Sequence, residues 1–591
     1  MIPKKDNSQK KIVFSLWGHI EKKRKRQLLY LSILMIVASL SEMASIGAVL
    51  PFLAALASPD IIYNHSSVQR VAYYFGIYEA NNLLLPLTFI FALSALMAGF
   101  FRIMLVWGET RLGHAVGADL SKNIFRKMLY QSYEYHIDKN GSEIIAAITV
   151  KVDRVVYGVI LPIISMVGQL LLLSFMVAIL VAIDYEVASF SFIGFGLIYG
   201  LIMLFTRKML TVDSICANQE SGRVVKILQE GLGGIREILI GGFQDIYVSN
   251  FGRHDGLMRK SLANVQIIGS IPRFGVEAIG VLFIAILAYR LNYTNGLVGT
   301  IPILGTLAIG SQRMLPIIQQ LFLNWTKLRG SSSALKDAVD LLNNPVPANA
   351  NLKFAVPINF EDKIKINSLS YGYGVGKPLV LSDINFSIPK GSVVGFIGPT
   401  GSGKSTLIDL IIGLLTPTGG SISVDEVDIV DENRRSWQNN ISHVPQVIFL
   451  SDATIAENIA FGIPIAEIDF KRVEYAASIA QIDSTIKGWE KGYKTIVGER
   501  GVKLSGGQRQ RIGIARALYD KNSKILVLDE ATSALDNATE EMLMTALNNV
   551  RRDITVLMIA HRLSTLKKCD LIIELDGGRI KKIGSYCDVI G

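Results

Sequence analysis

Six long apolar stretches in the first half of the chain constrain its fold more than any other feature. A helix needs ~20 mostly apolar residues to cross a bilayer. Half of all residues are hydrophobic and the mean hydropathy is +0.37, which is high for a soluble protein. The sequence therefore predicts an all-α membrane domain with six spans: Leu28 to Leu56, Leu83 to Trp107, Val155 to Ile183, Val187 to Phe205, Ile271 to Tyr289 and Leu297 to Ile318.

Basic residues indicate how these spans are oriented. The run Lys22–Arg26 directly precedes the first span, and the two long polar connections, near 108–154 and 206–270, are rich in Lys and Arg. Such residues concentrate on the cytoplasmic side of membrane proteins. We therefore expect both termini and both long connections in the cytoplasm. This placement also accounts for the net charge of +10 without nucleic-acid binding.

The long connections also show helical periodicity, so we expect membrane helices that extend into the cytoplasm and turn near Tyr133–Gly141 and Gly241–Ser249. After Ser331 the composition changes. Pro, Asn and Ala mark a linker, and short Val/Ile-rich runs then alternate with helical patterns. The predicted organisation is a membrane domain over 1–342, a linker over 343–357 and an α/β domain over 358–591.

A phosphate-binding loop lies near the start of the α/β domain. The pattern GxxxxGK[ST] follows the apolar run Val393–Ile397 and precedes a helical segment, the context that this motif requires. Glycines let backbone N–H groups turn toward phosphate oxygens, and the helix N-terminus adds its positive end. Lys404 then reaches the β- and γ-phosphates, and the Ser405 hydroxyl binds Mg²⁺. The predicted ATP-binding residues here are Gly398, Pro399, Thr400, Gly401, Ser402, Gly403, Lys404, Ser405 and Thr406.

Two carboxylates end another apolar strand. Asp529 and Glu530 follow the run Ile525–Leu528. Asp529 is suited to hold Mg²⁺, directly or through water, and Glu530 is placed to act as general base on the attacking water. Taken alone, the pair is equally consistent with an exposed strand end. Beside a phosphate-binding loop it indicates ATP hydrolysis.

The run Leu504, Ser505, Gly506, Gly507, Gln508 is the signature sequence LSGGQ of ABC ATPases, unaltered. It is expected at a helix N-terminus, where free amides form an anion site. With it, residues 358–591 as a whole resemble an ABC nucleotide-binding domain. The resemblance implies that Ser505, Gly506, Gly507 and Gln508 also contact ATP.

The resemblance implies roles for further residues. Gln446 matches the Q-loop, which senses the γ-phosphate and Mg²⁺, and His561 matches the switch histidine. Tyr373 matches the aromatic that stacks on adenine, with Tyr371 as the alternative. Residues 533–536 match the D-loop, and the segment from Thr495 to Gly501 resembles the part that meets the membrane domain in exporters.

In this family the phosphate-binding loop of one domain and the signature of another enclose each ATP. This chain has one of each, so the resemblance implies a dimer, most simply a homodimer, with a heterodimer as the alternative. Six spans followed by one nucleotide domain resemble an exporter half-transporter. ATP would close the nucleotide domains and switch the spans from inward- to outward-facing.

Ionisable residues within the spans bear on the cargo. Charged groups in a bilayer are costly and often functional. Arg102, Arg273 and Arg313 would suit an anionic group such as a pyrophosphate, because the guanidinium binds it by a fork of donors. Equally, Arg102 and Arg273 could extend to the cytoplasmic interface, and Arg273 could pair with Glu277, four residues on.

Local patterns also resemble the bacterial flippases of lipid-linked oligosaccharides. They are Ser41-Glu42 with Leu50–Phe52, Ile271–Phe274 with Glu277, and Arg313–Pro316. The resemblance implies a polyprenyl-pyrophosphate glycan as cargo and a bacterial inner membrane as location. The alternatives are an exporter of peptides, drugs or simple lipids and, more remotely, an ATP-gated channel or a soluble ABC ATPase acting on DNA. The apolar stretches oppose the last of these.

Overall fold

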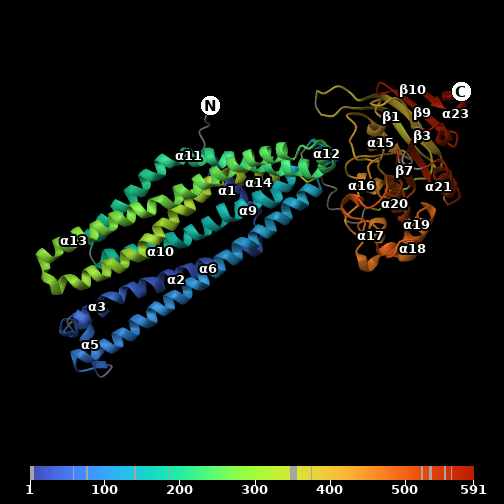
Figure 1. Ribbon diagram of the computed structural model, residues 1–591. Coiled ribbons are helices and arrows are strands. Elements are labelled where there is room, and N and C mark those ends of the chain that lie inside the picture. The colour runs from blue at the N-terminus through green and yellow to red at the C-terminus, as the bar shows by residue number, and fades with distance from the viewer. Residues whose placement is uncertain are drawn as a thin grey trace. The chain divides into compact units, whose positions relative to one another are not determined.

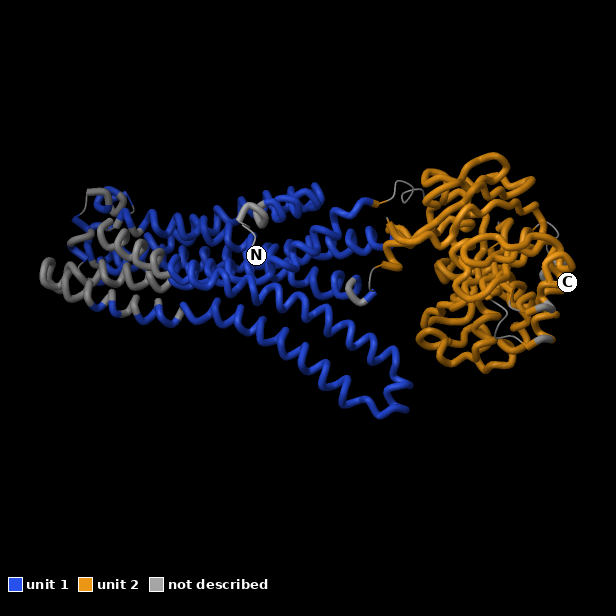
Figure 2. The backbone as a smooth tube through the Cα atoms, turned by 90° about the horizontal axis from the view of Figure 1, so that it is seen from above, with its two compact units in different colours: residues 1–129, 139–345 blue, residues 130–138, 346–591 orange. Residues whose placement is uncertain are grey.

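The computed structural model describes residues 6–57, 59–64, 66–74, 77–138, 141–183, 185–346, 356–374, 376–520, 523–530, 536–550, 554–560 and 562–590. The chain forms two compact units (Figure 2). The first unit contains residues 1–129 and 139–345. The second contains residues 346–591 together with the short segment 130–138, which comes from far earlier in the chain.

The first unit is helical throughout (Figure 1). Among the described residues, three helical segments are long and apolar enough to cross a membrane, and they agree with the first three predicted spans: Lys22–Leu56, Leu84–Leu129 and Ile144–Ile179. Its principal helices are α1 (Asp6–His19), α2 (Lys22–Gly47), α3 (Val49–Ala57), α4 (Pro59–Tyr63), α5 (Ser66–Tyr74), α6 (Leu84–Leu129), α8 (Gly141–Ala146), α9 (Val152–Val155), α10 (Leu161–Ile183), α11 (Tyr185–Gly233), α12 (Ile235–Gly241), α13 (Gln244–Gly330) and α14 (Ser332–Asn343).

The last three predicted spans fall within α11 and α13. The structure assigns helix throughout α13, 87 residues in all, where the sequence predicts two spans with a short connection. The element nevertheless turns back on itself (Figure 1), because Gly269 lies against Leu323 and Gly330 lies against Val265. Most side chains of these three spans lie outside the described ones.

The first predicted span continues through α2 and α3, which are separated only by Ala48, and Ala48 keeps helical angles with φ of −76° and ψ of −16°. Pro51 lies in the first turn of α3 and has no N–H to donate to a carbonyl of the preceding turn. The proline therefore accounts for a local interruption of the helical hydrogen bonds at this point. The apolar stretch therefore continues across two helices.

Glycine pairs mark the second turn between long helices. Gly233 and Gly234 separate α11 from α12, and Gly242, with φ of 66°, caps the end of α12. The sequence predicts a turn near 241–249, and Gly242 and Phe243, which separate α12 from α13, lie within that range. At the first turn, α6 ends at Leu129 and the short helix α7 (Tyr133–Asp138) follows.

The second unit contains two sheets. A four-stranded antiparallel sheet has the order β2-β1-β4-β5, and a six-stranded sheet has the order β10-β9-β3-β8-β7-β6. Strands β9, β3, β8, β7 and β6 run parallel, and β10 is antiparallel to β9. The strands are β1 (Lys363–Tyr371), β2 (Leu381–Pro389), β3 (Val393–Ile397), β4 (Gly419–Val424), β5 (Val427–Asp428), β6 (Ile441–Val444), β7 (Ile525–Asp529), β8 (Thr555–Ile559), β9 (Leu571–Asp576) and β10 (Arg579–Gly584).

Two apolar clusters hold these sheets and their helices. One joins the inner faces of both sheets to α15 (Lys404–Ile411), with Phe396 and Leu407 fully buried. The other packs α20 (Gly506–Tyr519) against α17 (Ile455–Ile459), α18 (Phe470–Ile479) and the other face of the parallel sheet. The parallel strands are buried on both faces, which accounts for their continuous apolar sequences. The remaining helices are α16 (Arg434–Gln438), α19 (Asp483–Lys487), α21 (Asn537–Val550), α22 (Leu563–Leu566) and α23 (Tyr586–Val589).

Candidate nucleotide site

The predicted ATP-site residues converge at one edge of the six-stranded sheet. In parallel strands the carboxyl ends lie at the same edge, where ligands of α/β folds bind. The register pairs Phe396 of β3 and Asp529 of β7 with Ile559 of β8, and Val444 of β6 with Leu528. The phosphate-binding loop, the two carboxylates and Gln446 therefore follow neighbouring strand ends. His561 follows β8 two residues later, outside the described residues.

The phosphate-binding loop connects β3 to α15. Gly403 is the N-cap of α15 with φ of 99°, and Lys404 is the first residue of that helix. The Lys404 side chain is only 7% exposed. Its Nζ donates to the carbonyl oxygens of Gly398 and Pro399, each at 2.9 Å. The ammonium is thus held inside the curve of its own loop.

The conformation of the loop fits a phosphate. Gly401 has φ of 83°, and a Cβ built there would meet no atom within 4 Å, so the backbone faces open space. The Oγ of Ser402 is buried and has no hydrogen-bond partner within the described part of the chain. A buried hydroxyl without a partner is costly and suggests a ligand that completes it. The loop therefore offers donors and room at the N-terminus of α15.

Glu530 follows β7 in a strained conformation. Its φ is 51°, a left-handed value that is uncommon for a residue with a side chain and that clusters at functional sites. Its Oε2 accepts a hydrogen bond of 2.7 Å from the Nε2 of Gln446. The structure thus brings together the predicted general base and the predicted Q-loop residue, which are 84 positions apart in sequence.

A third carboxylate, Asp409, lies beneath this edge on α15. Burial raises the pKa of its carboxyl to about 6, and the nearby charge of Asp529 acts in the same direction. Sequence analysis did not select Asp409. Its position five residues after Lys404 places it on the helix that carries the loop, but nothing in the sequence indicates its burial.

The signature sequence forms the N-terminus of α20. Ser505 is the N-cap, and its Oγ accepts a hydrogen bond from the backbone N–H of Gln508 at 3.2 Å. The Oε1 of Gln508 accepts one in return from the N–H of Ser505 at 2.8 Å. This capping box fixes the helix start. Gly506 and Gly507 occupy the first helical positions, where backbone N–H groups have no partner within the helix.

The two tyrosines considered for adenine stacking differ in exposure. Tyr371 is fully buried, whereas Tyr373 is half-buried and packs edge-on against it, with ring centroids 5.1 Å apart. The Tyr373 hydroxyl lies 3.2 Å from the Oγ1 of Thr406, at the start of α15. Tyr373 therefore lies beside the phosphate-binding loop with part of its ring accessible.

Buried Tyr371 contacts the segment 130–138. Its hydroxyl donates a 2.8 Å hydrogen bond to the Oε1 of Glu134 on α7. Burial, and then this bond, hold the pKa of the Tyr371 phenol above its ordinary value, so the hydroxyl is a donor at any physiological pH. Burial, followed by the charge of Asp409, also raises the pKa of Tyr133 on the same helix. Sequence analysis missed Glu134, because the contact spans 237 positions.

Of the three arginines selected in the spans, one has a described side chain. Arg102 is exposed on α6. The side chains of Arg273 and Arg313 lie outside the described ones. Residues 533–535 of the D-loop lie outside the described residues as well.

Comparison with known proteins identifies the family of both units. Residues 381–533 match the family described as ABC transporter, and residues 28–293 match the family described as ABC transporter transmembrane region. An ATP-dependent lipid A-core flippase of Legionella pneumophila is 31% identical over 486 residues, 81% of each chain. A multidrug resistance-like ATP-binding protein of Buchnera aphidicola is 29% identical and covers 85% of this chain and 86% of its own.

A solved structure of a bacterial Atm1-family ABC exporter with ATP bound has the same fold. It superposes with a TM-score of 0.76 over 96% of each chain, at 23% identity. The chain therefore belongs to the ABC transporters, and its nucleotide-binding domain binds ATP. Within that class it is a half-transporter of the exporter type, an integral membrane protein whose ATPase is coupled to transport.

Proposed function

We propose that two copies of this chain form two composite ATP sites and flip a lipid-linked oligosaccharide across a bacterial inner membrane. The observation that carries the ATPase part is the pairing of Glu530 with Gln446 at the strand edge next to the phosphate-binding loop. The substrate part is supported by relatives that are named ATP-dependent lipid A-core flippases.

The chemistry follows from the residues at the edge. Backbone N–H groups from Thr400 to Gly403 and the Lys404 ammonium bind the phosphates. The ring of Tyr373 stacks on the base, and residues 505–508 of the partner copy complete the enclosure. Glu530 accepts the proton of the attacking water, and Gln446 holds that carboxylate in position before ATP arrives.

Mg²⁺ is the expected cofactor. The hydroxyl of Ser405 at the start of α15, the carboxylate of Asp529 and the amide of Gln446 form a set of oxygen donors of the kind that Mg²⁺ prefers. When bound, the ion would neutralise charge on the phosphates. His561, which follows β8, is proposed to contact the γ-phosphate.

Transport requires that ATP binding change the conformation of the membrane helices. ATP favours the closed pair of nucleotide domains, and hydrolysis removes that preference. The segment 130–138 packs with the nucleotide domain, while the chain on both sides of it belongs to the helical unit. We propose that this segment carries the motion, that both termini are cytoplasmic, and that Arg102, Arg273 and Arg313 contact the pyrophosphate of the cargo.

The test uses the full chain reconstituted in liposomes. ATPase activity and flipping of a polyprenyl-pyrophosphate oligosaccharide are compared in the wild type, in Glu530→Gln and in Arg313→Ala. Glu490→Gln, an exposed glutamate of the same domain, is the matched control. We expect loss of hydrolysis in Glu530→Gln, and weaker lipid stimulation in Arg313→Ala.

Hydrolysis that persists in Glu530→Gln would refute the assignment of the base. Strong basal ATPase without any response to the lipid would refute the cargo and leave the exporter assignment in place. In that case drug export is the second candidate, which the multidrug resistance-like relative favours.

A further inference from the structure

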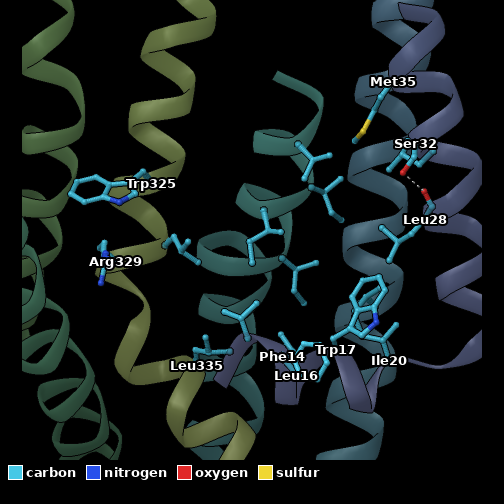
Figure 3. Close-up of a pocket in the computed structure, with 18 residues that line it drawn as sticks. Phe14, Leu16, Trp17, Ile20, Leu28, Ser32, Met35, Trp325, Arg329 and Leu335 are labelled. Carbon is cyan, nitrogen blue, oxygen red and sulfur yellow. Dashed lines mark hydrogen bonds between the residues drawn. The ribbon is translucent and has the colours of Figure 1, made fainter. Parts of the chain in front are cut away.

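A large cavity in the helical unit lies outside the nucleotide site. It measures about 740 Å³, within the roughly 300–1,000 Å³ of typical ligand sites. Its wall is built from α1, α2, α6, α10 and α13, with Leu335 of α14 at one end (Figure 3). Phe14 and Trp17, which line it, are 78% and 46% exposed, so the cavity is open to the outside of the chain.

The chemistry of this wall selects the kind of occupant. Arg329 is the one charged residue among the described lining residues, and no carboxylate is present there. Ser32 adds a hydroxyl, but its Oγ already donates to the carbonyl of Leu28 at 3.0 Å. The rest of the wall is apolar or aromatic. A peptide would bring amides that this wall cannot satisfy, and an unsatisfied amide is costly to bury. A hydrocarbon chain has no such groups.

The cations near the cavity lie beside its tryptophans. The Arg329 guanidinium lies 5.9 Å from the centroid of the Trp325 ring, and the Lys25 ammonium 5.6 Å from that of Trp17. Figure 3 shows Trp325 and Arg329 together on α13 and Trp17 among the α1 residues. Tryptophan and a basic residue together are typical of the membrane interface. One end of an occupant would therefore meet positive charge.

The lining residues on α2 indicate at which level of the membrane the cavity lies. The basic run Lys22–Arg26 begins this helix, and the lining residues Leu28, Ser32 and Met35 follow within three turns. The cavity thus starts where the charged run gives way to the apolar part of the helix. This is the level at which the headgroups of a leaflet meet their acyl chains.

We infer that this cavity binds an anionic phospholipid, with an acyl chain against α2 and α10 and the phosphate near Arg329. The site is separate from ATP hydrolysis and does not depend on the identity of the transported substrate. Attraction between one such cation and an anionic lipid is worth about 1 kcal/mol, which corresponds to about a fivefold preference over a zwitterionic lipid.

The test uses tryptophan fluorescence of the full-length protein in phosphatidylcholine nanodiscs. Bromine on an acyl chain quenches a tryptophan that the chain contacts. Trp107 is replaced by Phe because it is 68% exposed on a membrane helix and would contact any lipid. The Trp107→Phe protein is then compared with the same protein carrying Trp325→Phe as well, and the difference between them is the fluorescence of Trp325. We expect brominated phosphatidylglycerol to quench Trp325 at about one fifth of the concentration that brominated phosphatidylcholine requires.

Two variants test the geometry. Ser32→Phe fills the wall of the cavity and should abolish quenching of Trp325 by both lipids. Arg329→Gln should leave the quenching but remove the preference for phosphatidylglycerol. Leu40→Phe, on an exposed face of the same helix, is the matched control and should change neither. A single elution peak and binding of a fluorescent ATP analogue show that each variant is folded.

Each outcome decides the proposal. Equal quenching by the two lipids in the unmodified cavity would overturn the anionic specificity. Absence of Trp325 quenching by either lipid would overturn lipid binding and indicate that protein, such as the second copy, fills the cavity. If Ser32→Phe does not fold, Arg329→Gln alone carries the decision.

Discussion

Tyr371→Phe removes a single hydroxyl from the contact between β1 and α7. The ring and its packing against Tyr373 remain, so the substitution isolates the hydrogen bond to Glu134. A hydrogen bond to a charged group contributes roughly 1.5–3 kcal/mol. Glu134 is exposed and regains water when the bond is lost, so we expect about 1 kcal/mol.

The expected free-energy change is small, so the assay must measure the local opening of α7. About 1 kcal/mol changes the equilibrium between attached and detached α7 about fivefold. Hydrogen exchange of peptides covering 130–138 reports this equilibrium directly, because local opening exposes their amides. We expect these amides to exchange about fivefold faster in Tyr371→Phe, with no change in peptides from β7 or α20.

Tyr373→Phe is the matched control. It removes a hydroxyl from the neighbouring ring, whose partner is Thr406 and not Glu134. We expect no change in exchange at 130–138. Glu134→Gln retains an acceptor without the charge and should give an intermediate effect. Unchanged exchange at 130–138 in Tyr371→Phe would show that the bond does not hold this segment.

Three further predictions concern the nucleotide domain. Gly398→Ala should abolish binding of a fluorescent ATP analogue, because its Cβ would lie 2.1 Å from the carbonyl oxygen of Leu575. Gly401→Ala would place its Cβ in open space, so only backbone strain is expected; thermal unfolding should show a loss of stability of about 1–2 kcal/mol. Since burial raises the pKa of Asp409 to about 6, stability should fall as pH rises from about 4 to 6 and then level off. Asp409→Asn should therefore stabilise the domain by about 1–2 kcal/mol at pH 7.5 and by much less at pH 4. Thermal unfolding of the wild type and the variant measures this difference, and an equal gain in stability at the two pH values would contradict the prediction. Thr454→Ala should cost about 1 kcal/mol, because it removes the capping box that Thr454 forms with Glu457 at the start of α17, and urea unfolding would measure the loss.

Much of the nucleotide site was predictable because its chemistry is local in sequence. Lys404 lies at the start of the helix that follows β3, and Asp529 ends an apolar strand, so strand and helix patterns alone place both. What brings Gln446 to Glu530 is the parallel order of β6 and β7, which sequence patterns do not specify. The family resemblance supplied that link.

Other features depend on tertiary structure and have no local signal. The burial of Asp409 results from packing around α15, and the contact between Glu134 and Tyr371 joins residues 237 positions apart. The local interruption at Ala48 did have a signal, because Pro51 has no N–H to donate to the carbonyl four residues before it. The turn between α12 and α13 lies within the predicted range 241–249, whereas the short helix α12 before it was not predicted.

The membership of residues 130–138 in the second unit has a consequence for biosynthesis. A ribosome adding ~5–20 residues per second needs roughly 10 to 50 s to proceed from Glu134 to Tyr371. During that interval α7 has left the ribosome while the strand that receives it does not yet exist. The nucleotide domain therefore completes its folding on a segment made long before it, and a fragment synthesised from residue 346 onward would lack that segment altogether.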